Sequence, residues 1–542
     1  TQAESSAASD VYKRQMLSCI RRAFALLRDH YNRPLTLASV PPEDAATYDM
    51  LCEGRSVGVF QVESRAQMAM LPRLQPRCFH DLVVQVAIVR PGPIQGDMVH
   101  PYLRRRAGLE KVTYPSDALR GVLERTLGVP LFQEQAMQIA IVGAGFTGSE
   151  ADQLRRAMAT FKKHGDVAKF HDKMISGMIA RGYEPEFAER CFRQIEGFGT
   201  YGFPESHAAS FALLVYVSAW IKRHYPDVFI CALLNAQPMG FYSPSQLVAE
   251  ARRSGIAVRP ADVSHSGWDS TLEPDPANRE GLHALRLGLR LVKGLAAGEG
   301  ERIAASRGPS GRGTPWSSLA DIMRRADVSA RSLEAIANAD GFASLGLNRR
   351  QALWEVRALA GQRWQELPLF AHATRRHHDL AGEEPAVTLP QAHAGEEVAA
   401  DYRSLGLSLK DHPVRLLSRP LAKDGWQTCA VAHEARDGQR LRLAGLVTMR
   451  QRPGTAKGTV FLTLEDGLHS LNVIIWPKLT ETYRDAMLRS QILGVVGRIQ
   501  REKAVLHFIA DQLFNLNGYL RYLDEDAARN QRGTRMRSRD FR

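Results

Sequence analysis

Cysteine is scarce in this chain, whose 542 residues include only Cys19, Cys52, Cys78, Cys191, Cys231 and Cys429. None of these forms a Cys-x-x-Cys pair, which argues against a zinc cluster and against a disulfide framework. The adjacent His377 and His378 have no cysteine near them and do not complete a metal site. This cysteine usage fits a reducing cytoplasm.

Long apolar runs are missing too. The longest, near Phe211 to Ile221, is too short to span a bilayer and contains Ser218. No signal peptide precedes Met16, and we find no internal repeats. We therefore expect a globular protein of about three or four domains.

Positive charge is abundant by contrast: the net charge is +13, and the pI is about 9.6. The basic residues are spread along the whole chain, which favours a polyanionic partner such as nucleic acid. The alternative is an ordinary basic surface whose charges are solvated.

Hydrophobic periodicity predicts a mainly helical chain that ends in a small β-barrel. A helix is expected over Met16 to Tyr31, and long amphipathic helices over Leu51 to about Arg252. Residues 361–400 are rich in His, Glu, Ala and Pro and read as a linker. Strand patterns between Leu441 and Leu516, with a helix at Leu479 to Leu488, predict an OB fold.

Five sequence blocks in the first helical region carry the most information. They are Gly58 to Arg65 (GVFQVESR), Arg90 to Gln95 (RPGPIQ), Leu131 to Gln135 (LFQEQ), Arg155 to His164 (RRAMATFKKH) and Tyr201 to Phe211 (YGFPESHAASF).

The fourth block is a dense basic cluster. Arg155, Arg156, Lys162, Lys163 and His164 outnumber the nearby acids. Arginine forks match phosphate oxygens in a bidentate way, and lysine adds a mobile charge, so the cluster predicts phosphate binding. The alternative is local pairing, since Asp152 and Arg156 are one helical turn apart.

In the fifth block, Ser206 and His207 are adjacent. Adjacent helical residues point about 100° apart, so this pair does not form a hydrolase dyad. We interpret Ser206 as a helix cap. His207 is either a phosphate donor or a buried, hydrogen-bonded histidine.

In this order, the blocks resemble the fingers domain of bacterial C-family DNA polymerases, the alpha subunits of polymerase III. The resemblance runs from about Met16 to Leu516. It implies that Arg155 and Arg156 meet the triphosphate of the incoming nucleotide. It also implies that Arg90, Lys162, Lys163, Tyr201, Ser206 and His207 lie in or near the same pocket.

The resemblance also implies a division of the chain into domains. The expected parts are residues 1–50, a palm remnant and connector of which 1–15 could be unrelated sequence; 51–253, fingers; 254–360, helix–hairpin–helix; 361–435, linker; 436–520, OB fold; and 521–542, a basic tail that we expect to be disordered.

The segment Leu291 to Ala296 looks like the first hairpin of a tandem helix–hairpin–helix, with Lys293 and Gly294 as DNA-binding residues. Leu333 to Gly346 looks like the second half. Such hairpins offer backbone N–H groups to DNA phosphates. Ala296 stands where a second glycine is common, and a positive φ there would be costly. An ordinary glycine turn is the alternative.

Two further segments suggest partner sites. Gln365, Leu369 and Phe370 in the linker resemble a sliding-clamp peptide, the alternative being a loop that packs on its own domain. In the barrel, the DNA-binding candidates are Arg450, Arg452, Lys457 and Trp476, as a platform for single strands. Phe461 and Trp476 are otherwise core residues, which for Phe461 is the favoured interpretation.

The sequences of Ser206 to Val215 and Gly406 to Leu409 resemble those of the error-prone, damage-inducible paralogue. The absence of a further domain after the barrel points to the same paralogue. The resemblance implies translesion synthesis with an inactive Y-family-like partner and a RecA-like protein. A replicative alpha subunit truncated at both ends is an alternative.

Polymerisation needs two Mg²⁺ ions held by carboxylates. In this family those carboxylates lie in the palm, upstream of Met16, and Asp10 is a candidate remnant of the third. We therefore expect this chain alone to be inactive, although the intact protein would be a DNA-directed DNA polymerase. A non-catalytic DNA-binding protein is the competing hypothesis.

Overall fold

The computed structural model describes residues 2–88, 95–164, 167–198, 204–238, 242–307, 314–361, 389–452, 458–502, 505–523 and 539–541. The chain divides into two compact units, Thr1–Tyr225 and Pro226–Arg542. Each unit is described by itself. Within the described residues, no helix is long and apolar enough to cross a membrane.

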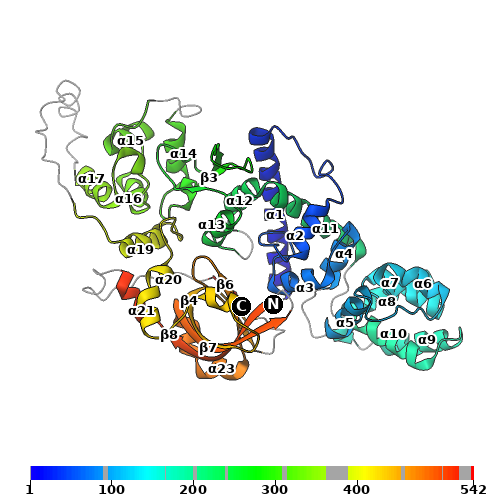
Figure 1. The fold of residues 1–542 in the computed structure, drawn as a ribbon. Helices are drawn as coiled ribbons and strands as arrows, with labels where there is room; N and C mark the ends of the chain where they lie inside the picture. Colours follow the sequence, from blue (N-terminus) through cyan, green and yellow to red (C-terminus); the bar gives the residue numbers. More distant parts are fainter. Residues whose placement is uncertain are drawn as a thin grey trace, which may run out of the picture. The chain divides into compact units, whose positions relative to one another are not determined.

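The first unit is helical (Figure 1). Its α-helices are α1 (Gln2–Tyr31), α2 (Ala45–Cys52), α3 (Arg65–Leu74), α4 (Phe79–Ile88), α5 (Gln95–Arg106), α6 (Asp117–Leu123), α7 (Gln133–Gln138), α8 (Gly148–His164), α9 (Val167–Ile179), α10 (Pro185–Phe198) and α11 (Glu205–His224), with the short η1 (Glu124–Thr126) and η2 (Ile139–Gly143) between them.

Two cores hold this unit together. Helix α11 packs on α4, whose residues Leu82, Val84 and Ala87 are fully buried. A separate core joins α6 to α10, with Leu119 and Leu154 at its centre. The predicted helix at Met16 to Tyr31 is present and starts earlier, at Gln2.

The second unit begins with α12 (Pro226–Asn235) and α13 (Pro244–Arg253) and then forms a small sheet of β1 (Val258–Arg259), β2 (Thr271–Glu273) and β3 (Ala284–Arg286). The strand order is β1-β3-β2. The sequence predicts only helices in this region, because strands of two or three residues leave too short a pattern to be recognised.

Helical hairpins follow the small sheet. The elements are η3 (Leu289–Leu291), α14 (Ala297–Ala305), α15 (Leu319–Ala326), α16 (Ala330–Asn338), η5 (Ala343–Leu345) and α17 (Arg349–Gly361), and then the connecting helices α19 (Ala394–Ser404), α20 (Pro413–Leu416), α21 (Ser418–Lys423) and α22 (Cys429–Glu434).

A closed barrel follows the connecting helices. Its elements are β4 (Arg440–Gln451), β5 (Val460–Glu465), β6 (Ser470–Ile475), α23 (Pro477–Thr482), α24 (Arg484–Arg489), β7 (Ile492–Glu502) and β8 (Val505–Asn515), followed by η8 (Asn517–Leu523) and β9 (Arg539–Phe541).

The barrel closes because β4 pairs with both β5 and β7, while β6 and β8 pair in parallel (Figure 1). Alternate residues of β6 point inward: Leu471, Val473 and Ile475 are buried, whereas the residues that alternate with them are exposed or only partly buried. Five strands in this order, with helices between β6 and β7, confirm the predicted mainly α chain followed by an OB-type barrel.

Two details of the barrel region differ from expectation. The helix predicted at Leu479 to Leu488 is two helices, α23 and α24, which meet at Tyr483. In the tail, for which we expected disorder, Arg539–Phe541 forms β9 and pairs in parallel with β4. The strand is stabilised by backbone hydrogen bonds, which composition does not reveal.

A β-bulge at Asp511 of β8, opposite Val496 and Gly497 of β7, shifts the pairing register of the two strands. A Cβ atom at Gly497 would lie 2.2 Å from the carbonyl oxygen of Ile509, and a backbone atom has no room to move away. We predict that Gly497→Ala destabilises the barrel by about 2 kcal/mol. Hydrogen exchange of β8 amides would then speed up by a corresponding factor.

The matched control for this substitution is Gly518→Ala, because nothing lies within 4 Å of a Cβ at Gly518. Unchanged exchange in β8 of the Gly497→Ala protein would show that the bulge tolerates a side chain.

Candidate functional site

Helix α8 presents the basic cluster. A capping box starts the helix: the Thr147 N–H donates to Glu150 Oε2 at 2.9 Å, and the Glu150 N–H donates to Thr147 Oγ1 at 3.3 Å. Leu154 is fully buried in the core of α6 to α10, and Ala151 is fully buried as well. This anchoring leaves Arg155 and Arg156 on the exposed side of the helix.

One carboxylate lies between these two arginines. Asp152 Oδ1 accepts hydrogen bonds from Arg155 Nε at 3.0 Å and Nη2 at 2.8 Å, and its Oδ2 lies 2.7 Å from Arg156 Nη2. Hydrogen bonds from Arg155 and then Arg156 lower the pKa of Asp152. The local pairing that the sequence offered as an alternative is therefore present, with both arginines taking part.

Both guanidinium groups contact this one carboxylate and remain open to solvent, and the Arg155 side chain is 44% exposed. The Arg156 side chain is 75% exposed, and exposed ion pairs contribute at most about 1 kcal/mol. A polyphosphate could displace Asp152 at small cost and gain bidentate bonds to both arginines.

The other nearby acid of α8 is engaged elsewhere. Glu150 pairs with Lys173 of α9, and the hydrogen bond from Lys173 is the main reason why its pKa falls to about 2. Glu150 therefore adds its charge to the α8–α9 contact and not to the arginines.

The structure does not describe the side chains of four of the predicted nucleotide-binding residues. Arg90 and Tyr201 fall outside the described residues. Lys162 and Lys163 are in α8, and their side chains are not described. The assignments for these four residues remain predictions.

Ser206 and His207 occupy the exposed first turn of α11. The helix begins at Glu205 with Pro204 as its N-cap, so our interpretation of Ser206 as the cap was wrong. The capping acceptor is Glu134 of α7, whose Oε2 accepts from the Glu205 N–H at 2.9 Å. The ring of His207 packs on Phe211 with 4.5 Å between centroids.

Glu134 links two of the sequence blocks. It lies in the block Leu131 to Gln135, and α7 also packs on α8. The short helix α7 thus contacts the helix of the arginines and the start of the helix that carries Ser206 and His207. No described contact joins the arginines directly to these two residues.

The block Gly58 to Arg65 has a supporting role. Val59, Phe60 and Val62 are fully buried, and the Phe60 ring stacks on Phe211 of α11. Lys222 Nζ donates to the carbonyl oxygen of Val57 at 2.8 Å. The block therefore holds α11 in place, a role that we could not distinguish from ligand binding in the sequence.

In the second unit, the first predicted hairpin has the expected turn. Gly294 has a φ of +89°, and Ala296 is the N-cap of α14 with a φ of −75°. The concern about strain at Ala296 therefore does not apply. Lys293 Nζ, however, donates to the carbonyl oxygens of Tyr402 and Arg403 at 2.8 and 3.0 Å.

The barrel residues differ in their availability. Arg450 is 8% exposed and donates from Nε to the Met487 carbonyl at 2.7 Å, with a second bond to Ser490. Trp476 is 51% exposed, and Arg452 is exposed as well. Phe461, for which we favoured the core, is only partly buried. Lys457 and the clamp-peptide residues Gln365, Leu369 and Phe370 lie outside the described residues.

Finger-like helices, helical hairpins and a barrel follow one another in the order expected for a C-family DNA polymerase. A comparison with known families gives two matches. Residues 16–182 match the finger domain of the bacterial DNA polymerase III alpha subunit, and residues 255–352 match the helix-hairpin-helix motif. The predicted resemblance to the C-family DNA polymerases is thereby confirmed for the finger domain, and the predicted helix–hairpin–helix is confirmed by the second match.

Named relatives make the likeness more specific. The chain is 53% identical to "Error-prone DNA polymerase 2" of Rhizobium meliloti (strain 1021), over 95% of this chain and 47% of that protein. It is 54% identical to "Error-prone DNA polymerase" of Allorhizobium ampelinum, over 94% of this chain and 46% of that protein. The chain thus spans about half the length of the curated relatives that it matches.

We predict that Asp152→Asn raises the affinity for inorganic triphosphate up to about fivefold, since the competing carboxylate is worth about 1 kcal/mol or less. Isothermal titration at low salt measures this change.

The control is Asp485→Asn, which frees one arginine of an exposed pair, Arg489, on barrel helix α24. Equal gains for both variants would mean that only net charge matters and that the arginine pair of α8 is not a site.

Proposed function

We propose that this chain provides the nucleotide-binding and DNA-holding parts of an error-prone DNA polymerase, which catalyses template-directed nucleotidyl transfer. One observation carries the proposal: Arg155 and Arg156 share a single carboxylate on the exposed side of a finger-domain helix. Two exposed guanidinium groups side by side suit the triphosphate of an incoming dNTP.

In this proposal the chain's residues act by binding and orientation. Arg155 and Arg156 hold the phosphates of the nucleotide, where they also compensate charge on the leaving pyrophosphate. Ser206 and His207, at the start of α11, lie next to the bound nucleotide. Arg90, Lys162, Lys163 and Tyr201 complete the pocket.

Two Mg²⁺ ions would steady the attacking and leaving oxygens. Among the described residues, no group of three or more His, Cys, Asp or Glu side chains could hold a metal ion. We therefore assign no metal ligand there. Asp10 remains our candidate for a third carboxylate, and its side chain is not among those described.

Primer–template DNA is the proposed polymer substrate. The hairpins contact duplex phosphates through backbone N–H groups around Gly294, and Trp476 with Arg452 binds single strands on the barrel. Gln365, Leu369 and Phe370 contact a sliding clamp. A Y-family-like protein and a RecA-like protein are the proposed partners in translesion synthesis, in the cytoplasm.

Primer extension with Mg²⁺ and four dNTPs, by the protein that carries this chain as purified from its host, tests the function. We predict that Arg156→Ala lowers kcat/KM for dNTP by at least about tenfold, because a charge-assisted bond to phosphate contributes about 1.5–3 kcal/mol. Arg156→Lys keeps the positive charge but loses the bidentate guanidinium, so its kcat/KM should lie between those of the unmodified protein and Arg156→Ala.

Arg193→Ala is the matched control, since Arg193 is also exposed but lies on α10. If Arg156→Ala leaves both KM for dNTP and kcat unchanged, the assignment of this helix to the nucleotide is wrong. DNA binding without any extension would favour a non-catalytic DNA-binding protein.

A further inference from the structure

Helix α19 lies between the helix–hairpin–helix domain and the barrel. It packs on α16 on one side and on η8 on the other. The contact with η8 is close: a Cβ atom at Gly395 would lie 2.4 Å from the carbonyl oxygen of Leu523. Leu523 belongs to a second core on the outer face of the barrel, together with Ala444 and Leu446 of β4.

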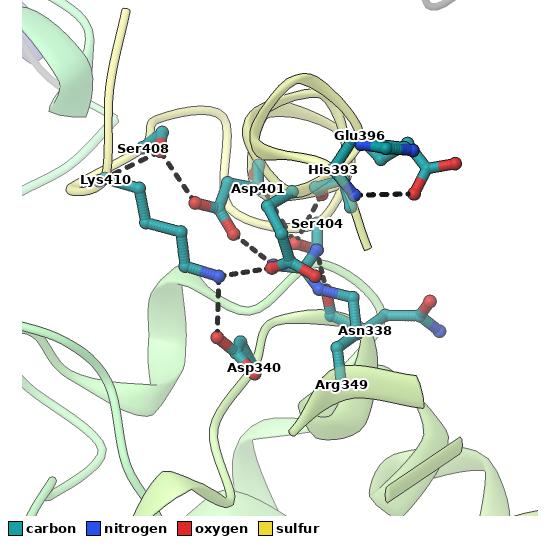
Figure 2. Close-up of polar contacts among 11 residues, drawn as sticks. Asn338, Asp340, Arg349, His393, Glu396, Asp401, Ser404, Ser408 and Lys410 are labelled. Carbon is teal, nitrogen blue, oxygen red and sulfur yellow. Dashed lines mark hydrogen bonds and ion pairs between the residues drawn. The ribbon is translucent and has the colours of Figure 1, made fainter. Parts of the chain in front are cut away.

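A cluster of charged side chains binds α19 to the hairpins (Figure 2). Arg349, the first residue of α17, pairs with Asp401 and lies 3.2 Å from Glu397, both on α19. Lys410 donates to Asp340 at 2.7 Å and also pairs with Glu397. Asp340 follows α16, so Lys410 joins the end of this hairpin helix to α19.

The centre of this cluster is buried. The side chains of Arg349 and Asp401 are 7% and 5% exposed, and burial raises the pKa of Asp401 despite its arginine partner. Ser408 Oγ donates to Asp401 at 2.7 Å. A buried ion pair gains little net stability over an apolar pair, but its geometry restricts how two elements can meet.

The cluster is not itself a phosphate site, because its three carboxylates (Asp340, Glu397 and Asp401) outnumber its two cations (Arg349 and Lys410). Its cations are paired with carboxylates of the protein itself. The role left to the cluster is to hold the hairpins and α19 together.

Lys293 makes a second connection to the same helix. Its ammonium group caps the carbonyls of Tyr402 and Arg403 in the last turn of α19. The backbone N–H of Lys293 donates to the Ser404 carbonyl at 2.9 Å. A cation at a helix C-terminus is favourable. The first hairpin is thus fixed to α19 independently of the charge cluster.

The chain after α19 reaches the barrel within a few residues. Arg252 of α13 donates to the Leu409 carbonyl at 2.7 Å, and Val414 of α20 is fully buried in the core that includes Ala444 and Leu446. Lys410 therefore stands in a short segment that is fixed at both ends.

We propose that Asp340, Arg349, Asp401 and Lys410 are positioning residues that hold the hairpins and the barrel at a fixed spacing, so that DNA contacting both is bound as a chelate. This inference rests on the proposed function. When two DNA-binding parts are rigidly joined, the second contact is intramolecular and the joint affinity rises well above that of either part.

Asp340→Asn gives the sharpest test. The φ of Asp340 is +57°, a conformation that asparagine tolerates well, so the backbone is preserved. The substitution removes a negative charge, which by electrostatics alone strengthens DNA binding. We expect the opposite for a partial duplex with a single-stranded overhang: about tenfold weaker binding, measured by fluorescence anisotropy.

Binding of a blunt duplex and of an oligo(dT) strand should not weaken in the same variant. Asp485→Asn is the control, because it removes the same charge from an exposed pair of barrel helix α24. Lys410→Met should weaken junction binding in the same way, and its control Arg415→Met loses the same charge from a local pair with Asp411.

Spin labels at Glu301→Cys and Gln500→Cys, in a Cys78→Ser background, report the spacing directly. The distance distribution between the labels should broaden in the Asp340→Asn and Lys410→Met proteins. Lys410→Arg should restore both the narrow distribution and the junction affinity.

Unchanged distances together with junction affinities equal to those of the controls would overturn the inference. An unmodified chain that binds neither duplex nor single strand would instead refute the proposed DNA-holding function itself.

Discussion

The shared contact of Arg155 and Arg156 with Asp152, in the middle of α8, is the interaction on which the proposed nucleotide site depends. Asp152 accepts from Arg155 and Arg156 at once, so it orients both guanidinium groups while their side chains stay 44% and 75% exposed. Glu150, in the first turn of α8, is bound by Lys173 of α9.

In the second unit, basic residues are of two kinds: those whose charged group binds an acceptor within the protein, and those whose charged group is exposed to solvent. Arg450 and Lys293 donate to backbone carbonyls, and Arg349 and Lys410 meet carboxylates. These four cations stabilise contacts within the protein. Their side chains are not available to contact a polyanion directly, although this pairing leaves the net charge of +13 unchanged. Arg452, directly after β4, stays exposed.

Much of the fold could be predicted from the sequence, because periods of 3.6 and 2 report local burial. The barrel strands and most helices follow from these periods, and strands of two or three residues do not. The site was harder. Arg155 and Arg156 follow from local charge density, but the role of Val59 and Phe60 behind α11 depends on contacts far apart in the chain. The cap supplied by Glu134 to Glu205 is of the same kind.

Lys293 shows why motif likeness does not fix a residue's partner. The hairpin turn is formed as expected, with Gly294 at a positive φ, yet the lysine beside it points its charge at the end of α19. Phosphate binding by this hairpin would then depend on backbone N–H groups. These groups are uncharged and so release none of the counterions condensed on DNA, and they keep their geometry only while the turn is held. Because the ammonium of Lys293 fixes that turn to α19, it would support DNA binding through the shape of the hairpin, and its charge would contribute little to the salt dependence.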